Sequence, residues 1–338
     1  MKKALVFCLS MTALFFSHSV EAKILRVAYS GPAVSGVDYP NVQAAVNAAA
    51  VDDTIQLYQN ASVGSTTVNK RLVFVGFGYS LGVNSGLQAV ADAPNSVTLN
   101  FASGAEDSKV QGVFGNFYLG INNITISRCV GTAYLGYNSS VGLVQISSAT
   151  LISSYLNING NYGQVGNLLV SNCIINSGSA INVAGLFSNN IFLSTANGMS
   201  FGACVVKNNI FTNNGSWGCP SSTSAVFQNN LFSTNCSSSF TGSNNQFNIN
   251  MTNVFVNWNS GSFGSESNIA LKAGSPALGA GLDGNGNPTD AGIYGGEPGF
   301  VYKPSGIPAI PAIYQLTSPG LNANTNPYTI TVSVRSNN

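Results

Sequence analysis

The chain is poor in the residues that acid–base chemistry needs. Between Lys109 and Glu266 it contains neither Asp nor Glu, and Arg128 and Lys207 are the only charged residues in that stretch. Hydrolysis of a glycosidic bond needs two acidic groups, and a general acid–base pair cannot be assembled from Asn, Ser and Thr alone. The long central part of the chain therefore offers no catalytic site of the usual kind.

The catalytic candidates that remain are Asp92, Asp107 and Arg128. A polysaccharide lyase or glycoside hydrolase with a non-standard site would have to use them. Arg128 could serve as a lone base, but it lacks nearby carboxylates that would hold a metal. A solvated loop is the favoured interpretation of Asp107, and a packing or surface role that of Arg128. The sequence thus favours a non-catalytic protein, with an enzyme as the rival hypothesis.

One stretch, "DGNGNPTD", has oxygen-bearing side chains at alternating positions, partly like a calcium-binding loop. These candidate metal ligands are Asp283, Asn285, Asn287 and Asp290. The stretch lacks the downstream Glu of an EF-hand, and Pro288 stands where that loop needs Gly. Gly, Asn, Pro and Asp are also ordinary turn residues. We therefore expect a plain turn, with structural calcium as the alternative and no other cofactor.

Aromatic residues in Gly- and Asn-rich stretches are the binding candidates. They are Tyr134, Tyr137, Tyr155, Tyr162 and Trp217. Exposed aromatic rings stack on sugars, and Asn and Ser supply neutral hydrogen bonds to hydroxyl groups. These residues predict a face that binds a polysaccharide or a cell-surface glycan. The alternative is that the loops pack their own aromatic rings onto the rest of the molecule.

The N-terminus has the pattern of an export signal. Lys2 and Lys3 precede an apolar stretch, and Val20-Glu21-Ala22 supplies a small-residue cleavage site. We expect residues 1–22 to be a signal peptide and the protein to be secreted or at the cell surface, with the periplasm as the alternative. Cleavage would remove His18, the only histidine. No later segment resembles a membrane-spanning helix, so no integral membrane segment is expected.

Composition narrows the class of partner. The net charge is +1 and charged residues make up 7% of the chain, which gives no basic surface for nucleic acid. Hydrophobic residues make up 44%, enough to bury a core. Five cysteines lie beyond the predicted signal peptide. We expect them to act as small buried apolar residues, with disulfides among Cys204, Cys219 and Cys236 as the alternative.

The central sequence consists of short β-rich units with a repeated pattern. "LFSNNIFLS", "VVKNNIFTN" and "VFQNNLFST" each contain an Asn pair, an aliphatic residue and Phe. The residues that align are Ile174, Ile191, Ile210, Leu231 and Val254, at spacings of 17, 19, 21 and 23 residues. Constant strands joined by loops of varying length are typical of a solenoid. The pattern predicts a parallel β-helix that "NVFVN" (253–257) would close.

The Asn pairs are expected to be scaffold. Asn adopts the left-handed backbone conformation more readily than most residues, so it suits a tight bend. Asn residues that recur at one bend can also hydrogen-bond from coil to coil as a ladder. The predicted ladder residues are Asn190, Asn209 and Asn230, and the predicted stack beside them is Phe192, Phe211 and Phe232. One coil earlier, Cys173 and Ile175 would take the equivalent places.

Three stretches resemble a known family. "VQAAVNAAAVDDTIQLYQ" is similar to the N-terminal capping helix and first strand of the pectate-lyase-like superfamily, especially of its secreted bacterial members. "VNKRLVFVGFGY" resembles the following coil, and "LKAGSPALGAGLDGNGNPTDAGIYGG" the closing segment. The resemblance implies an all-β fold, a single-stranded right-handed parallel β-helix over residues 23–300 with an N-terminal capping helix. That fold hosts lyases, hydrolases and proteins without known activity, so it does not identify a reaction.

Residues 301–338 are a Pro-rich segment followed by a C-terminal β tail. In that tail "YTITVSVRS" alternates like one strand. We expect it to pack along the rod, with addition to a partner's sheet edge as the alternative. The sequence as a whole predicts a secreted β-helix that binds or displays extracellular polysaccharide without catalysis. The rival functions are a polysaccharide lyase or hydrolase and a purely structural or adhesive rod.

Overall fold

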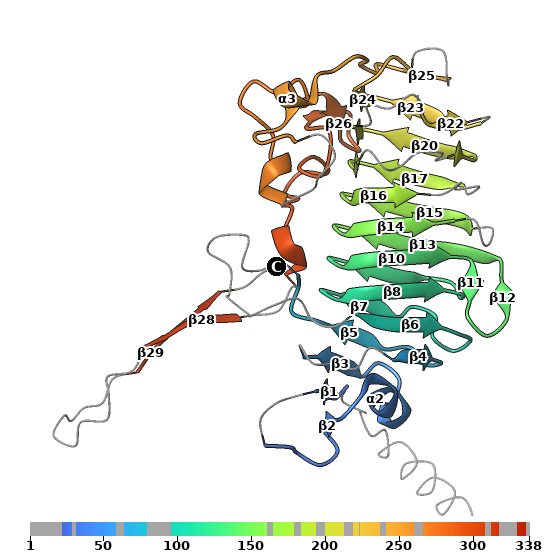
Figure 1. The fold of residues 1–338 in the computed structure, drawn as a ribbon, viewed down its shortest axis with the longest axis vertical. Coiled ribbons are helices and arrows are strands. Elements are labelled where there is room, and N and C mark those ends of the chain that lie inside the picture. The colour runs from blue at the N-terminus through green and yellow to red at the C-terminus, as the bar shows by residue number, and fades with distance from the viewer. Residues whose placement is uncertain are drawn as a thin grey trace, which may run out of the picture.

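A computed structural model describes residues 22–28, 32–58, 64–79, 96–160, 165–178, 184–193, 200–212, 219–222, 224–236, 241–259, 266–307, 312–317 and 330–335. Most of the strands stack into two long parallel sheets that form an upright rod (Figure 1). The larger sheet has twelve strands. In spatial order they are β2 (Asp38–Tyr39), β1 (Ile24–Val27), β3 (Thr54–Leu57), β5 (Val73–Val75), β7 (Lys109–Gln111), β9 (Ile124–Ser127), β13 (Ile146–Ile152), β15 (Val165–Ser171), β17 (Gly185–Ser188), β20 (Cys204–Lys207), β23 (Val226–Gln228) and β25 (Thr241–Ser243).

The smaller sheet has nine strands. From the C-terminal end of the rod they are β24 (Leu231–Phe232), β21 (Ile210–Phe211), β18 (Ile191–Phe192), β16 (Ile174–Gly178), β14 (Tyr155–Asn159), β10 (Val130–Leu135), β8 (Phe114–Leu119), β6 (Val97–Phe101) and β4 (Ser65–Val68). From β7 onward the chain alternates between the two sheets, so each coil adds one strand to each. A short parallel pair, β19 (Ser200–Phe201) with β22 (Ser221–Ser222), lies between later coils. This arrangement confirms the predicted all-β parallel solenoid.

The core lies between the two sheets, because alternate side chains of each strand point inward. In β8, for example, Gly115, Phe117 and Leu119 are buried. The predicted Phe stack is confirmed. The ring centroids of Phe192 and Phe211 are 4.4 Å apart and those of Phe211 and Phe232 4.6 Å apart, with each pair nearly parallel.

The predicted register is confirmed for all but the last unit. Ile174, Ile191, Ile210 and Leu231 are successive partners in the smaller sheet. Val254 is not the next, because it ends the short helix α3 (Met251–Val254), and Leu231 instead bridges to Gln246. The last coil is shorter than the others and places Gln where the earlier coils have an aliphatic residue.

The sequence "NNQF" is therefore the true last repeat. Its second Asn, Asn245, accepts hydrogen bonds from the backbone and the side chain of Asn230 at 3.1 and 2.9 Å. Its Phe247 ring lies 5.4 Å from that of Phe232 and so extends the stack. The strand predicted at 253–257 is wrong, and the last repeat is centred on Gln246 rather than on Val254.

The two residues of each Asn pair have different roles. The first, at Asn189, Asn208 and Asn229, has a φ of 56°, 58° and 53° and makes the bend. The second makes the ladder. The Oδ1 atom of Asn209 accepts from the N–H and Nδ2 of Asn190 at 2.8 and 2.9 Å, and Asn230 repeats the arrangement. The ladder is confirmed, but the bend and the ladder use different residues.

The ladder continues with other side chains in the earlier coils. The backbone N–H of Cys173 donates to Asn190 Oδ1 at 2.9 Å, which confirms the place expected for Cys173. The N–H of Cys129 donates to Ser154 Oγ, and that of Val113 donates to Cys129 Sγ. Any short side chain that accepts a hydrogen bond can therefore satisfy this buried N–H.

The cysteines divide between the core and one disulfide. Cys219 and Cys236 are bonded to each other. Cys129, Cys173 and Cys204 are buried free thiols. Burial raises the pKa of Cys129 and Cys173 to about 12 and that of Cys204 to about 11. The expectation of buried filler holds for these three, and the alternative of a disulfide holds for Cys219 and Cys236.

A helix lies at the N-terminal end of the rod (Figure 1). It is α2 (Val42–Ala48), and its N-cap Asn41 accepts a hydrogen bond from the N–H of Ala44. Its residues Val42, Ala45 and Val46 are buried in the main core. A helix is thus present in the stretch where the resemblance implies one.

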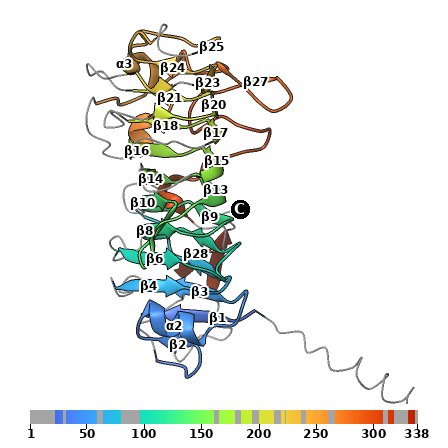
Figure 2. The ribbon, with the colours of Figure 1, turned by 90° about the vertical axis from the view of Figure 1, so that its right-hand side faces the viewer.

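After the last coil the chain turns back along the rod (Figures 1 and 2). The returning chain starts at η1 (Glu266–Ile269), a short 3₁₀ helix, and contains β26 (Gly281–Leu282), β27 (Pro288–Thr289) and η2 (Pro304–Gly306). We call residues 277–307 the C-terminal strap. It covers outward-facing residues of the smaller sheet such as Ile174, Ile191 and Ile210, and together they form a second apolar cluster.

The tail is a hairpin rather than the one strand predicted. In it β28 (Ala312–Thr317) pairs antiparallel with β29 (Thr331–Arg335). Figure 1 shows the hairpin projecting from the rod, so the expected packing along the rod is not seen. Ile330, Val332 and Val334 are each about half exposed.

Candidate functional site

The outer surface of the smaller sheet carries a row of neutral polar and aromatic residues near its middle. Strands β6, β8, β10 and β14 are parallel neighbours, so outward residues at the same register line up along the rod. One line is Thr98, Asn116, Thr132 and Asn157, and the next is Asn100, Tyr118, Tyr134 and Asn159. We call these eight residues, with Tyr137, the polar–aromatic face.

Three tyrosines form the centre of this face. The rings of Tyr118 and Tyr134 are stacked, with centroids 4.4 Å apart and planes 5° from parallel. The Tyr137 ring lies 5.5 Å from that of Tyr118. All three side chains are partly exposed. Because each ring is held by a neighbour, it presents surface to a ligand with little rotamer entropy left to lose.

A small hairpin borders the tyrosines. Its strands are β11 (Tyr137–Asn138) and β12 (Gly142–Leu143), and it projects from the rod in Figure 1. Val141 and Leu143 near its tip are 71% and 64% exposed. The hairpin thus adds apolar surface beside the aromatic rings.

Amides make the rest of the face a source of neutral hydrogen bonds. Asn176 donates through Nδ2 to Asn157 Oδ1 at 3.0 Å. Asn100 is buried under the hairpin, where its Oδ1 accepts from the N–H of Ser139. Among the described residues, Asn100 Nδ2 is a buried polar atom without a hydrogen-bond partner. Neither line of the face contains a charged residue, so its chemistry suits hydroxyl groups rather than anions.

The structure brings together two of the five predicted binding residues, Tyr134 and Tyr137. It adds Tyr118, which the sequence reasoning missed. The signal was present, because "GNFYLG" (115–120) and "GTAYLG" (131–136) place Tyr118 and Tyr134 at the same point of adjacent coils. The repeat is hard to see because Phe117 and Ala133, both core residues, differ in size.

The other predicted aromatic residues do not join the face. Tyr155 points outward at the start of β14, in register with Ile174, and packs against the second apolar cluster. Burial raises the pKa of Tyr155. Tyr162 and Trp217 lie outside the described residues.

The catalytic candidates are not brought together. Asp107 is exposed in the turn before β7, whereas Arg128 follows the end of β9. Since β7 and β9 are adjacent parallel strands, these two residues lie at opposite ends of them. Asp92 lies outside the described residues.

Arg128 instead contacts the strap. Its Nη1 donates to the backbone carbonyl of Ile307 at 2.9 Å, and its own φ of 53° places it at the bend that Asn residues occupy in later coils. Burial lowers the pKa of Arg128. These contacts are those of a packing residue, the role favoured from sequence.

The "DGNGNPTD" stretch forms a turn closed by Asp283. Its Oδ1 accepts from the N–H groups of Asn285 and Asn287, each at 2.8 Å, and its Oδ2 accepts from Asn287 Nδ2. These hydrogen bonds lower the pKa of Asp283. Asp290 is engaged elsewhere, because its Oδ1 accepts from the N–H of Gly279. The turn expected from the sequence is present, and bound calcium stays a prediction.

Sequence reasoning missed a buried carboxylate. Glu266 is 3% exposed and accepts hydrogen bonds from the hydroxyl groups of Tyr79 and Tyr302 at 2.9 and 2.7 Å and from the N–H of Ser305. Burial first, and then nearby ionisable groups including Glu266, raise the pKa of both tyrosines well above the usual value. Glu266 ties the start of the returning chain to η2 and to an early coil. Its burial suits anchoring rather than acid–base catalysis.

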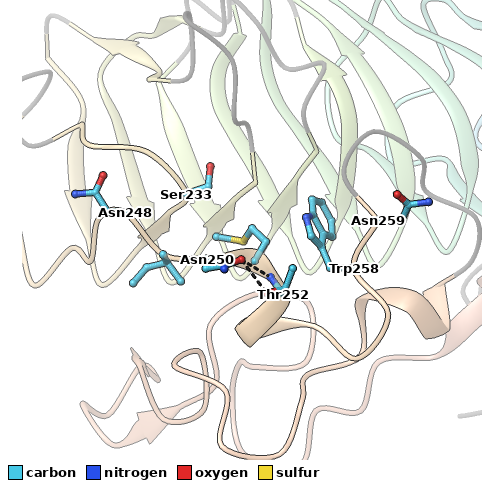
Figure 3. A pocket seen from close by; sticks show the side chains of 8 residues that line it. Ser233, Asn248, Asn250, Thr252, Trp258 and Asn259 are labelled. Atoms are coloured by element: carbon cyan, nitrogen blue, oxygen red, sulfur yellow. Dashed lines mark hydrogen bonds between the residues drawn. The ribbon is translucent and has the colours of Figure 1, made fainter.

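A second feature missed from sequence is a hollow at the C-terminal end of the rod (Figure 3). It has a volume of about 460 Å³. Its lining residues are Ser233, Asn248, Ile249, Asn250, Met251, Thr252, Trp258 and Asn259. We call it the Trp258 hollow. The signal that could have found it is Trp258 itself, one of two tryptophans in the chain.

Other kinds of site are not found in the described ranges. The residues that the structure describes contain no cluster of three or more His, Cys, Asp or Glu residues that could hold a metal ion. None of their helices has the length and apolar character needed to span a membrane. No family model, curated protein or solved structure matches the chain.

Proposed function

We propose that this protein is an exported right-handed β-helix that binds extracellular polysaccharide and catalyses no reaction on it. The polar–aromatic face is the observation that carries the proposal, because stacked tyrosines flanked by neutral amides match the apolar faces and hydroxyl edges of sugar rings. A polysaccharide is favoured over a small sugar because both lines of residues run along the rod through several coils. Asp107 and Arg128 lie at opposite ends of two adjacent strands, and their separation supports a non-catalytic role.

Three features support the rest of the proposal. Parallel strands connected by crossovers are right-handed in almost all proteins, which supports the hand. The burial of α2 at the end of the rod supports a capping role, as in the pectate-lyase-like proteins that the sequence resembles. The signal-like N-terminus and the Cys219–Cys236 disulfide together support export to an oxidising compartment.

Retention on insoluble polysaccharides tests the proposal. The mature protein (23–338) is mixed with cellulose, xylan, mannan, chitin and mixed-linkage glucan, and the bound fraction is measured. We expect retention on at least one, and Tyr134→Ala or Tyr137→Ala should weaken it about three- to tenfold by removing an aromatic contact. Tyr58→Ala is the matched control, because Tyr58 is also partly exposed and packs on another ring, that of Phe77, but lies off the face.

Three outcomes would contradict the proposal. Release of unsaturated or hydrolysed oligosaccharides, read by mass spectrometry in the same samples, would establish an enzyme. No retention on any polysaccharide would leave a structural or adhesive rod. Equal retention of Tyr134→Ala and wild type would move the binding away from the polar–aromatic face.

A further inference from the structure

We propose that the Trp258 hollow is a second sugar-binding site, which takes one or two uncharged sugar units at the C-terminal end of the rod. The hollow shares no residue with the polar–aromatic face, because α3 and the last coil form the hollow (Figures 1 and 3). Its volume of about 460 Å³ falls within the roughly 300–1,000 Å³ of small-molecule sites.

One wall of the hollow is aromatic and anchored. The Trp258 ring lies 5.3 Å from the ring of Phe255, which is 1% exposed, and the rest of the indole is partly exposed. Met251, which also lines the hollow, is buried. An indole held on one side by the core and open on the other is suited to stack against the apolar face of a sugar.

The remaining lining residues offer hydrogen bonds at several points. Asn250 Oδ1 accepts from the N–H and the hydroxyl group of Thr252 at 3.0 and 2.8 Å, which fixes the orientation of both side chains. In the described part of the chain, the exposed side chains of Asn248 and Asn259 have no hydrogen-bond partner. In Figure 3 Asn248 and Trp258 lie on opposite sides of the Asn250–Thr252 pair. Their amides can each donate to and accept from a hydroxyl group.

The uncharged lining of the hollow favours neutral sugars over charged ones. Its lining contains no Asp, Glu, Lys, Arg or His. A uronate or sulfate would lose hydration there without gaining a cation, whereas a neutral sugar exchanges water for amides and hydroxyls. The geometry therefore points to a neutral hexose or pentose, or an N-acetylated sugar.

The fluorescence of Trp258 tests this proposal directly. The chain has two tryptophans, so Trp217→Phe makes Trp258 the sole indole emitter. We expect at least one of the cello-, xylo-, manno-, laminari- and chito-hexaoses to change its emission saturably, and hexagalacturonate to leave it unchanged. Absence of a saturable change with every neutral oligosaccharide, or an equal response to hexagalacturonate, would overturn the proposal.

Matched variants separate this site from the proposed face. Asn259→Ala should raise the Kd at least threefold, while Asn253→Ala, at an exposed Asn on α3 outside the hollow, should leave it within twofold. Tyr134→Ala in the single-tryptophan chain should keep the titration and weaken retention on insoluble polysaccharide about three- to tenfold. In the chain with Tyr134 intact, retention without a titration would contradict the hollow alone, and a titration without retention would contradict the face alone. Calorimetry on Trp258→Ala, with Trp217 intact, gives a second measurement, and undiminished binding heat would also overturn the proposal.

Discussion

At the scale of the residue, hydrogen-bonding capacity decides which side chain can stand at the ladder position, directly after the bend. A coil that leaves the larger sheet turns one backbone N–H toward the buried interior, and a buried N–H without an acceptor costs about 1–3 kcal/mol. Asn209 supplies the acceptor for the coil before it, and also donates through Nδ2 to Asn230 Oδ1 and to the carbonyl of Phe187. A serine or cysteine supplies only part of this set, which is why the complete ladder belongs to the Asn coils.

Removal of one ladder residue should therefore be costly. Asn209→Ala removes the acceptor of the Asn190 N–H and one of the two hydrogen bonds of Asn190 Nδ2 in a region that water does not reach. It also removes the hydrogen bond that Asn209 Nδ2 donates to the carbonyl of Phe187. We expect the free energy of unfolding in urea to fall by about 2–5 kcal/mol. Asn253→Ala, at an exposed position, should change it by less than about 0.5 kcal/mol. A loss below about 1 kcal/mol for Asn209→Ala would contradict the ladder's role.

At the scale of the element, the bend residues Asn172, Asn189 and Asn208 hold the C-terminal strap. Asn172 Nδ2 donates to the carbonyls of Ile293 and Gly295 at 3.1 and 2.7 Å, and Asn189 Nδ2 donates to that of Asp290. The strap then covers the apolar residues beside the bend. One residue type thus serves two purposes, because the backbone conformation that makes the bend also directs the amide outward to the strap.

Substitution of a bend Asn by Gly can separate the bend from the contact with the strap. Asn172→Gly keeps a residue that accepts positive φ without strain and removes the two hydrogen bonds to the strap. At about 0.5–1.5 kcal/mol per bond, amide hydrogen exchange of strap residues 289–296 should become about 5- to 160-fold faster. Asn244→Gly is the matched control, because Asn244 has a φ of 55° at the same bend but no bond to the strap. Equal exchange in the two variants would show that the apolar cluster alone holds the strap.

At the scale of the whole molecule, the rod buries acidic groups that are neutral at ordinary pH. Burial raises the pKa of the Cys129 and Cys173 thiols to about 12, that of Cys204 to about 11 and that of Tyr294 to about 12. The unfolded chain would release these protons near the ordinary pKa values of 9.0 for Cys and 10.0 for Tyr. Between the unfolded and the folded pKa the native state binds more protons, so stability falls as pH rises.

Because the free energy of unfolding falls as pH rises in this range, the protein should be sensitive to alkali. We expect the free energy of unfolding to change little from these groups below about pH 8 and to fall between about pH 9 and 12. Each buried group should contribute about 1.4 kcal/mol per pH unit across its own interval. Urea midpoints at pH 8 and pH 11 give the measurement, and Cys129→Ser with Cys173→Ser should reduce the slope. Unchanged midpoints at the two pH values would contradict the prediction.

The sequence by itself determined the repeating architecture. Asn pairs at nearly constant offset from an aliphatic residue and Phe predicted the parallel coils, the ladder at Asn190, Asn209 and Asn230 and the Phe stack, because these features arise between consecutive coils and depend on local bends. The same logic failed at the last coil, where Gln246 replaces the aliphatic residue and hides the repeat. Periodicity can identify a repeat only where the core residues are similar enough to align.

Tertiary structure alone decided which surface residues meet. Tyr118 joined Tyr134 and Tyr137 because of strand register, while Tyr155, on the neighbouring coil, turned toward the strap. Trp258 and Glu266 gained their surroundings from the path of the chain after the last coil. No spacing in the sequence encodes that path, because it depends on long-range contacts between the strap and the bends. The scaffold was therefore predictable from local rules, and the candidate sites were not.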